Sequence, residues 1–286
     1  MPGLDAQVLG LHLLSRSTAA AAAVASALLA TSAFGATPSD PGARPWLDAP
    51  LGYLLRTGDE LGVDVALLLR VVGQLTGDSR ASEVAEIRRL GFTDHEIGRL
   101  APLFTLELPV LAAAGPTIEP LPPPSLPPAP SPADRQTLDG RRANAATCLD
   151  RAAACELGPG CTDWATDPRF VGLELTHQAA WLLFVRWRSC PVEIELEDLQ
   201  IRLAGRLLGE LAIDHDYSEA HLERVATLGH LGYGDRIEAE WVGTIVAARS
   251  PAGCWGAKPG GPCHPHPTAL ALWALALAER SGAWKP

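Results

Sequence analysis

The chain has 286 residues, a hydrophobic content of 47% and a formal net charge of -10. This length allows one large domain or two small ones, and the apolar content is that of a folded globular protein. The negative charge disfavours nucleic acids and anionic membranes as partners, because both are bound through clustered Lys and Arg side chains.

Residues 1–35 have the pattern of a signal peptide. Arg16 precedes an Ala-rich apolar stretch, and Ala33-Phe34-Gly35 supplies the small residues that a signal peptidase needs. An uncleaved anchor and a disordered tail are the alternatives. We therefore expect a secreted or extracytoplasmic protein that is not an integral membrane protein once the signal is cleaved.

The cysteines support export, because all of them lie in the second half of the chain and their number is even. An exported chain is expected to join them in up to three disulfides, while the sequence leaves the pairing open. They are Cys148, Cys155, Cys161, Cys190, Cys254 and Cys263.

Apolar residues at helical spacing predict roughly ten helices and no convincing sheet. The expected helices cover 46–56, 61–77, 79–90, 134–155, 170–188, 199–211, 217–231, a segment capped by Asp235, and 267–278. Capping boxes at 57–60 and 93–96 are expected to begin helices. Residues 155–167 are expected to form a loop.

A Pro-rich segment at 115–133 divides the helices into an N-terminal part, 44–114, and a C-terminal part, 134–286. We expect it to be an extended linker or an excursion from the fold, with a ligand for a Pro-binding module as the alternative.

The last expected helix is apolar on all sides, so other helices must enclose it. Short connections favour antiparallel neighbours. Together these features predict an all-α fold, arranged as a double layer in which an outer ring of helices shields an inner ring.

The turn before this helix supports the same architecture. The segment from Trp241 to Trp255, which closes on Pro-x-Gly-x-Trp-Gly, resembles the repeat of α/α-toroid proteins such as terpene cyclases and protein prenyltransferases. Thr268-Ala269-Leu270 stands where those repeats begin their next helix. The usual Gln before the turn and the consecutive aspartates of the cyclases are absent. The resemblance therefore implies a toroid-like fold without cyclase chemistry.

A second resemblance covers most of the chain in patches. The motifs at 173–178 and 253–256, together with Cys190 and Cys263-x-x-His266-x-Thr268-Ala269, are similar to an uncharacterised family of secreted, cysteine-containing helical proteins known mainly from animals. Residues 47–52 match the start of that domain more weakly. The resemblance implies that both sides of the Pro-rich segment belong to one fold, and it implies no activity.

The turn also contains the first candidate site. We expect Cys254 and Cys263 to form a disulfide and no cofactor to be bound. The alternative is a zinc site made by Cys254, Cys263, His264 and His266. Asp214, Asp216 and Glu219 could hold calcium, although capping of the following helix explains the same residues.

Two function hypotheses follow. The first is a binding or structural protein whose cavity holds a ligand, with Trp181, Trp255 and Glu174 as candidate contacts. The second is a toroid-type enzyme acting on a glycan or another extracellular substrate, with His177 and His266 as acid–base residues. The enzyme requires both histidines and a carboxylate to meet in one open pocket.

Overall fold

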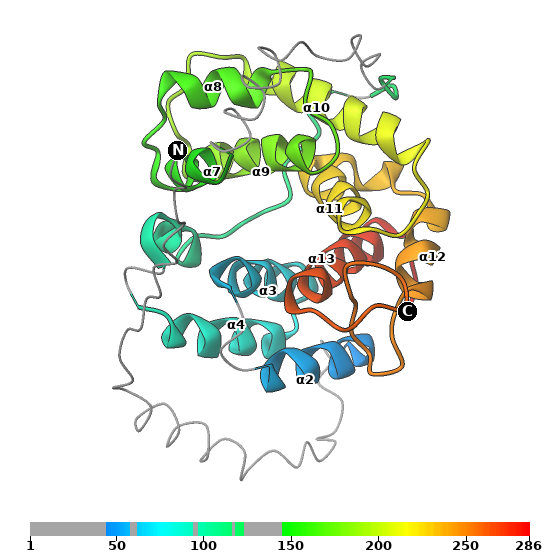
Figure 1. Cartoon of the computed structure of the whole chain (residues 1–286). Helices are drawn as coiled ribbons and strands as arrows, with labels where there is room; N and C mark the ends of the chain where they lie inside the picture. Colours follow the sequence, from blue (N-terminus) through cyan, green and yellow to red (C-terminus); the bar gives the residue numbers. More distant parts are fainter. Residues whose placement is uncertain (1–43, 58–61, 94–96, 116–117, 123–144) are drawn as a thin grey trace, which may run out of the picture. The chain divides into compact units, whose positions relative to one another are not determined.

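A computed structural model describes residues 44–57, 62–93, 97–115, 118–122 and 145–286 (Figure 1). All of them belong to one unit, Gly42–Pro286, which includes both helical parts expected from the sequence. The expected signal peptide lies outside the described residues. Within the described ranges, no helix has the length and apolar character that crossing a membrane requires.

Every regular element in these ranges is helical, which confirms the all-α class. The α-helices are α2 (Asp48–Arg56), α3 (Val63–Thr76), α4 (Ser79–Gly91), α7 (Ala145–Ala154), α8 (Pro159–Thr166), α9 (Leu173–Arg188), α10 (Leu196–Leu211), α11 (Glu219–Leu228), α12 (Ala239–Ala247) and α13 (Pro265–Ser281). Short 3-10 elements are η1 (Pro45–Leu47), η3 (Gly98–Phe104) and η5 (Gly234–Arg236), and η4 (Gly229–Tyr233) is a π-helical turn.

Some helix boundaries differ from the prediction. The expected loop at 155–167 contains α8, which begins at a Pro in its first turn, where the missing N–H costs no hydrogen bond. Thr57 donates its hydroxyl to carbonyls at the end of α2 instead of starting a helix. The remainder of that capping box and most of the box at 93–96 lie outside the described residues.

The helices pack in a ring. Helix α3 packs against α13, α13 against α11, α11 against α9, and α9 against α7, which contacts η3; η3 contacts α3 again. Helices α4, α8, α10 and α12 alternate with these along the chain and pack against members of the ring, as Figure 1 shows. The N- and C-terminal parts therefore complete one arrangement.

Helix α13 is enclosed, as its apolar sequence requires. Its residues from Pro267 to Ala278 are buried among α2, α3, α11 and α12. Each fully buried Leu side chain contributes about 2 kcal/mol. His266, in the first turn, is an exception, with 26% of its side chain exposed.

The turn before α13 is cross-linked and hydrogen-bonded. Cys254 and Cys263 form a disulfide, and the Trp255 N–H donates to the Thr268 hydroxyl at 3.1 Å. The Trp255 indole is buried and donates to the Ile245 carbonyl at 2.7 Å. These contacts fix where α13 begins.

The other cysteines are also paired, which confirms the expectation of disulfides. Cys148 is bonded to Cys161 and joins α7 to α8, and Cys155 is bonded to Cys190 just beyond the ends of α7 and α9. No cysteine is free.

A buried ion pair fixes the start of α9 relative to α10 and α11. The Glu210 carboxylate pairs with Arg224 at 2.7 Å and accepts the N–H of Gly172 at 3.0 Å. Gly172 precedes α9 and has a φ of 63°, a conformation that favours glycine. The helices that carry His177 and Glu219 are thereby held together.

Residues 107–115 and 118–122 form no helix or strand and lie against α10 and η4. The Leu111 N–H donates to the His230 carbonyl, and the Leu121 N–H donates to the Gly205 carbonyl. Ile118 is 3% exposed. The described residues of the Pro-rich segment therefore contact α10, with Ile118 buried and residues 119–122 exposed.

This packing predicts opposite effects for two helical glycines. A Cβ at Gly209 would overlap the carbonyl of Leu121, whereas a Cβ at Gly243 meets nothing within 4 Å. We expect Gly209→Ala to lower the free energy of unfolding by about 1–3 kcal/mol. The matched control Gly243→Ala is expected to raise it by about 1 kcal/mol. Urea denaturation measures both, and equal effects would contradict the packing described.

Candidate functional site

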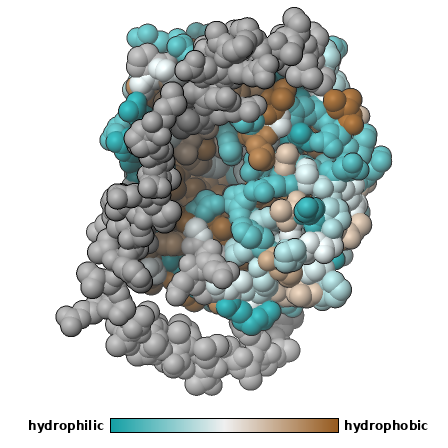
Figure 2. Space-filling view, in the orientation of Figure 1, coloured by the Kyte–Doolittle hydropathy of each residue, from teal (hydrophilic) through white to brown (hydrophobic). Residues whose placement is uncertain are grey.

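The ring surrounds a pocket with a volume of about 380 Å³. Its described lining comes from α3, η3, α7, α9, α11 and α13, and helices α2, α4, α8, α10 and α12 contribute none of it. Most of these residues are apolar, namely aliphatic side chains together with the aromatic rings of Phe184, Trp187 and Trp273. Figure 2, drawn in the orientation of Figure 1, shows hydrophobic side chains gathered in the hollowed part of the molecular surface. This size and composition are typical of a small-molecule site.

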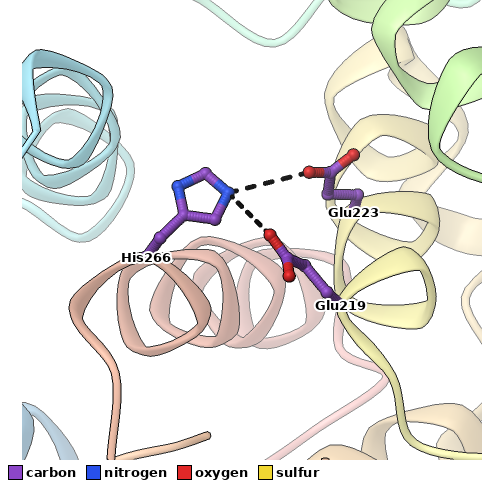
Figure 3. A group of neighbouring side chains, drawn as sticks. All are labelled: Glu219, Glu223 and His266. Atoms are coloured by element: carbon purple, nitrogen blue, oxygen red, sulfur yellow. Dashed lines mark ion pairs between the residues drawn. The ribbon is translucent and has the colours of Figure 1, made fainter. Parts of the chain in front are cut away.

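His266 is the centre of a polar cluster in this pocket. Its Nε2 atom lies 3.3 Å from Glu219 Oε1 and 3.8 Å from Glu223 Oε1 (Figure 3). Its Nδ1 atom lies 2.6 Å from Asp64 Oδ2, although this contact is not aligned as a hydrogen bond. Three carboxylates from two helices thus surround one imidazole.

Local sequence explains these positions. Pro265 and Pro267 suit the first turn of α13 and place His266 there, facing α3 and α11. Glu219 and Glu223 are four residues apart, so both lie on one face of α11. Ser218, and not Asp216, caps α11, since its hydroxyl accepts the His221 N–H at 3.1 Å.

The carboxylates keep His266 protonated. Burial alone would lower the pKa of His266, but its contacts with Asp64 and Glu223 outweigh burial and raise the pKa to about 10. The pKa of Asp64 is lowered, because contact with His266 outweighs the opposite effect of burial. The cluster can therefore hold a proton, or another cation, at its centre.

Residues of α9 complete this part of the pocket. The Thr176 hydroxyl contacts Glu223 Oε2, and Glu223 is only 8% exposed. His177 lines the same pocket on the helix face that also carries Ala180 and Phe184. The structure thus brings both candidate histidines to one pocket that contains carboxylates, which is the arrangement that the enzyme hypothesis requires.

The other candidate residues lie elsewhere. Trp181 and Trp255 are fully buried in the helix packing and, like Glu174, do not line this pocket. The sulfurs of Cys254 and Cys263 are bonded to each other, so they are not thiolate ligands for zinc. The prediction of a zinc site with Cys254 and Cys263 as ligands is therefore wrong. Of the four residues in that prediction, only His266 lines the pocket.

Asp64 and Glu223 were missing from the sequence prediction. The spacing of Glu219 and Glu223 was a readable signal, because residues four apart share a helix face. Asp64 offered no signal, since an acidic residue in the first turn of a helix is common. The sequence predicts Glu219 only as a cap or a calcium ligand, whereas it pairs with His266.

A buried histidine supports the aromatic walls from behind. In η4, His230 accepts the Trp273 indole N–H on Nδ1 at 2.9 Å, so its Nε2 carries the proton and faces the Leu108 and Pro109 carbonyls. Its ring also lies 5.0 Å from that of Trp187. Burial lowers the pKa of His230 to about 4. The neutral ring therefore positions two residues that line the pocket.

This buried histidine predicts a loss of stability in acid. Because the pKa of His230 is about 4 in the folded chain and 6.5 in a free histidine, protons favour the unfolded chain below pH 6.5. Its contribution is complete above pH 6.5 and is lost as the pH falls towards 4, a change of about 3 kcal/mol.

The measurement is urea denaturation at pH 7 and pH 4. The difference in stability between the unmodified chain and His230→Asn should shrink by about this amount at the lower pH. The same comparison with His215→Asn, at an exposed histidine, should give a constant difference. An unchanged difference for His230→Asn would refute the assignment of a buried neutral ring.

No family model, curated protein or solved structure matches this chain. The likeness to a family of secreted helical proteins therefore stays a prediction, and the functional argument rests on the residues of the pocket.

Proposed function

We propose that the protein binds a small, largely apolar molecule in the central pocket and directs a polar group of that molecule to the His266 cluster. The observation that carries this proposal is the lining, in which aliphatic and aromatic side chains form most of the wall and three carboxylates gather around His266. A pocket with apolar walls and one polar cluster fixes the orientation of an amphipathic ligand.

The architecture supports this proposal. We infer that the ring of helices is an α/α-toroid-like double layer, because the helices that line the pocket alternate along the chain with helices that do not. The three disulfides support the further inference that the protein acts outside the reducing cytosol. The inference of export agrees with the expected signal peptide.

A neutral fluorescent probe tests binding. We expect N-phenyl-1-naphthylamine to bind the full chain with increased emission, because the pocket removes it from water. Ala180→Trp places a large side chain in the pocket and should weaken binding by about tenfold or more, the equivalent of about 1.4 kcal/mol.

The matched control is Ala212→Trp, at an exposed position after α10. It should bind the probe as the unmodified chain does, and thermal melting should confirm that both variants fold. Equal affinity of both variants would show that the probe binds elsewhere and would contradict the proposal.

Acid–base catalysis in the same pocket is a second candidate. The specific observation is that His177 and His266, which come from α9 and α13, line one pocket with carboxylates. The apolar walls favour an apolar ester over a glycan, because a sugar needs more hydrogen-bond partners than this lining offers. In ester hydrolysis, a carboxylate takes a proton from the attacking water and a histidine gives one to the departing alcohol.

A panel of p-nitrophenyl esters of increasing acyl length tests this candidate. Turnover is expected to fall by about 100-fold or more in His177→Asn and in His266→Asn, the usual effect of losing an acid–base residue. His215→Asn, at an exposed histidine, should keep full activity. Absence of turnover across the panel, or turnover that survives both substitutions, would leave binding as the function of the pocket.

A further inference from the structure

The pocket contains more negative charge than its described residues neutralise. Asp64, Asp150, Glu219 and Glu223 line it, and the described lining contains no Lys or Arg. Its only basic side chains are those of His177 and His266. The charge of Glu223, only 10% of whose side chain is exposed, is costly unless a cation compensates it. This surplus of charge indicates that the pocket takes a positively charged ligand.

We propose that Glu219, Glu223 and His266 bind a divalent metal ion, with zinc as the best match. Their ligand atoms all lie within 4.8 Å of one another. Tetrahedral zinc with ligands at about 2.0–2.1 Å needs ligand atoms about 3.3 Å apart. His266 Nε2 lies 3.3 Å from Glu219 Oε1 and 3.8 Å from Glu223 Oε1, so these two pairs are already close to the tetrahedral spacing.

Asp64 lies where a carboxylate that orients a metal-binding histidine is usually found. It contacts Nδ1, the ring atom that faces away from the two glutamates, and so leaves Nε2 for the ion. A carboxylate that accepts a hydrogen bond from this atom holds the ring and makes it a better ligand, and the 2.6 Å ion pair with Asp64 places a carboxylate there. Binding of the ion displaces the proton from Nε2.

Glu223 is also held in place for this role. The Thr176 hydroxyl contacts Oε2, which leaves Oε1 as the oxygen nearest to His266. The side chain is 90% buried, so little water is available to compensate its charge. A metal ion here gains from both the shortage of water and the fixed carboxylate.

Three protein ligands are typical of a catalytic metal site and not of a structural one. Structural zinc is bound by four side chains, whereas catalytic zinc is bound by three and keeps an open position. The three ligands line the pocket, so the open position is accessible to a bound molecule. The inference rests on the proposed function, since the ion provides the contact for the ligand's polar group.

Calorimetric titration of the untagged, chelator-treated chain with Zn²⁺, Mn²⁺ and Ca²⁺ tests the site. We expect one ion per chain, with Zn²⁺ bound most tightly, since imidazole favours zinc over calcium. Glu219→Gln, Glu223→Gln and His266→Asn should each weaken Zn²⁺ binding by about 100-fold or more. Asp64→Asn, which removes only the orienting carboxylate, should weaken it by about 10–100-fold.

Two variants outside the pocket serve as matched controls. Asp163→Asn and His215→Asn remove an exposed acid and an exposed histidine that do not line the pocket, and should leave Zn²⁺ affinity unchanged. The visible spectrum of bound Co²⁺ adds a readout of the ligands, and it should be lost in His266→Asn even where that variant folds normally.

The inference is overturned if no ion binds at millimolar concentration, or if the ligand variants bind Zn²⁺ as tightly as the controls. Probe binding, measured in the same metal-free samples, separates this failure from failure of the proposed function. If the chain binds N-phenyl-1-naphthylamine but no ion, the proposed binding function is supported and the metal site is rejected. If an organic amine binds in place of any ion, the cationic ligand is the amine and the metal site is rejected.

Discussion

The enclosure of α13 is the constraint on which the rest of the structure depends. A helix that is apolar on every side has no surface to offer to water, so it is stable only with neighbours all around it. Packing α3 and α11 against it brings the first turns of all three helices together. His266 therefore meets Asp64 from one neighbour and Glu219 and Glu223 from the other.

The cluster that results is a poor choice for stability alone. Apolar side chains of similar size at these positions would avoid the cost of burying the Glu223 carboxylate, only 10% of whose side chain is exposed. A buried carboxylate elsewhere in the described chain is matched by a cation, as in the Glu210 and Arg224 pair. A local departure from this matching is typical of sites that are retained for function.

The sequence predicts the helices well and the pocket poorly. The apolar helix, its enclosure and the Cys254–Cys263 pair follow from local pattern and composition. The pocket does not, because α9 has ring neighbours on one side and α8 and α10 on the other. Both of its faces are apolar, so the pattern could not show that His177 faces the pocket and Trp181 does not. Asp64 reaches His266 only through the packing of distant segments, which no local spacing encodes.

The closing contact of the ring joins α3 to α13, at opposite ends of the described chain. During synthesis the earlier helices leave the ribosome first and have no partner for the side that will face α13. The pocket therefore has no complete wall until the last helix has emerged. A chain that stops short of α13 exposes the apolar faces of α3 and α11 together, and it presents a substrate for chaperones and proteases instead of a partly working protein.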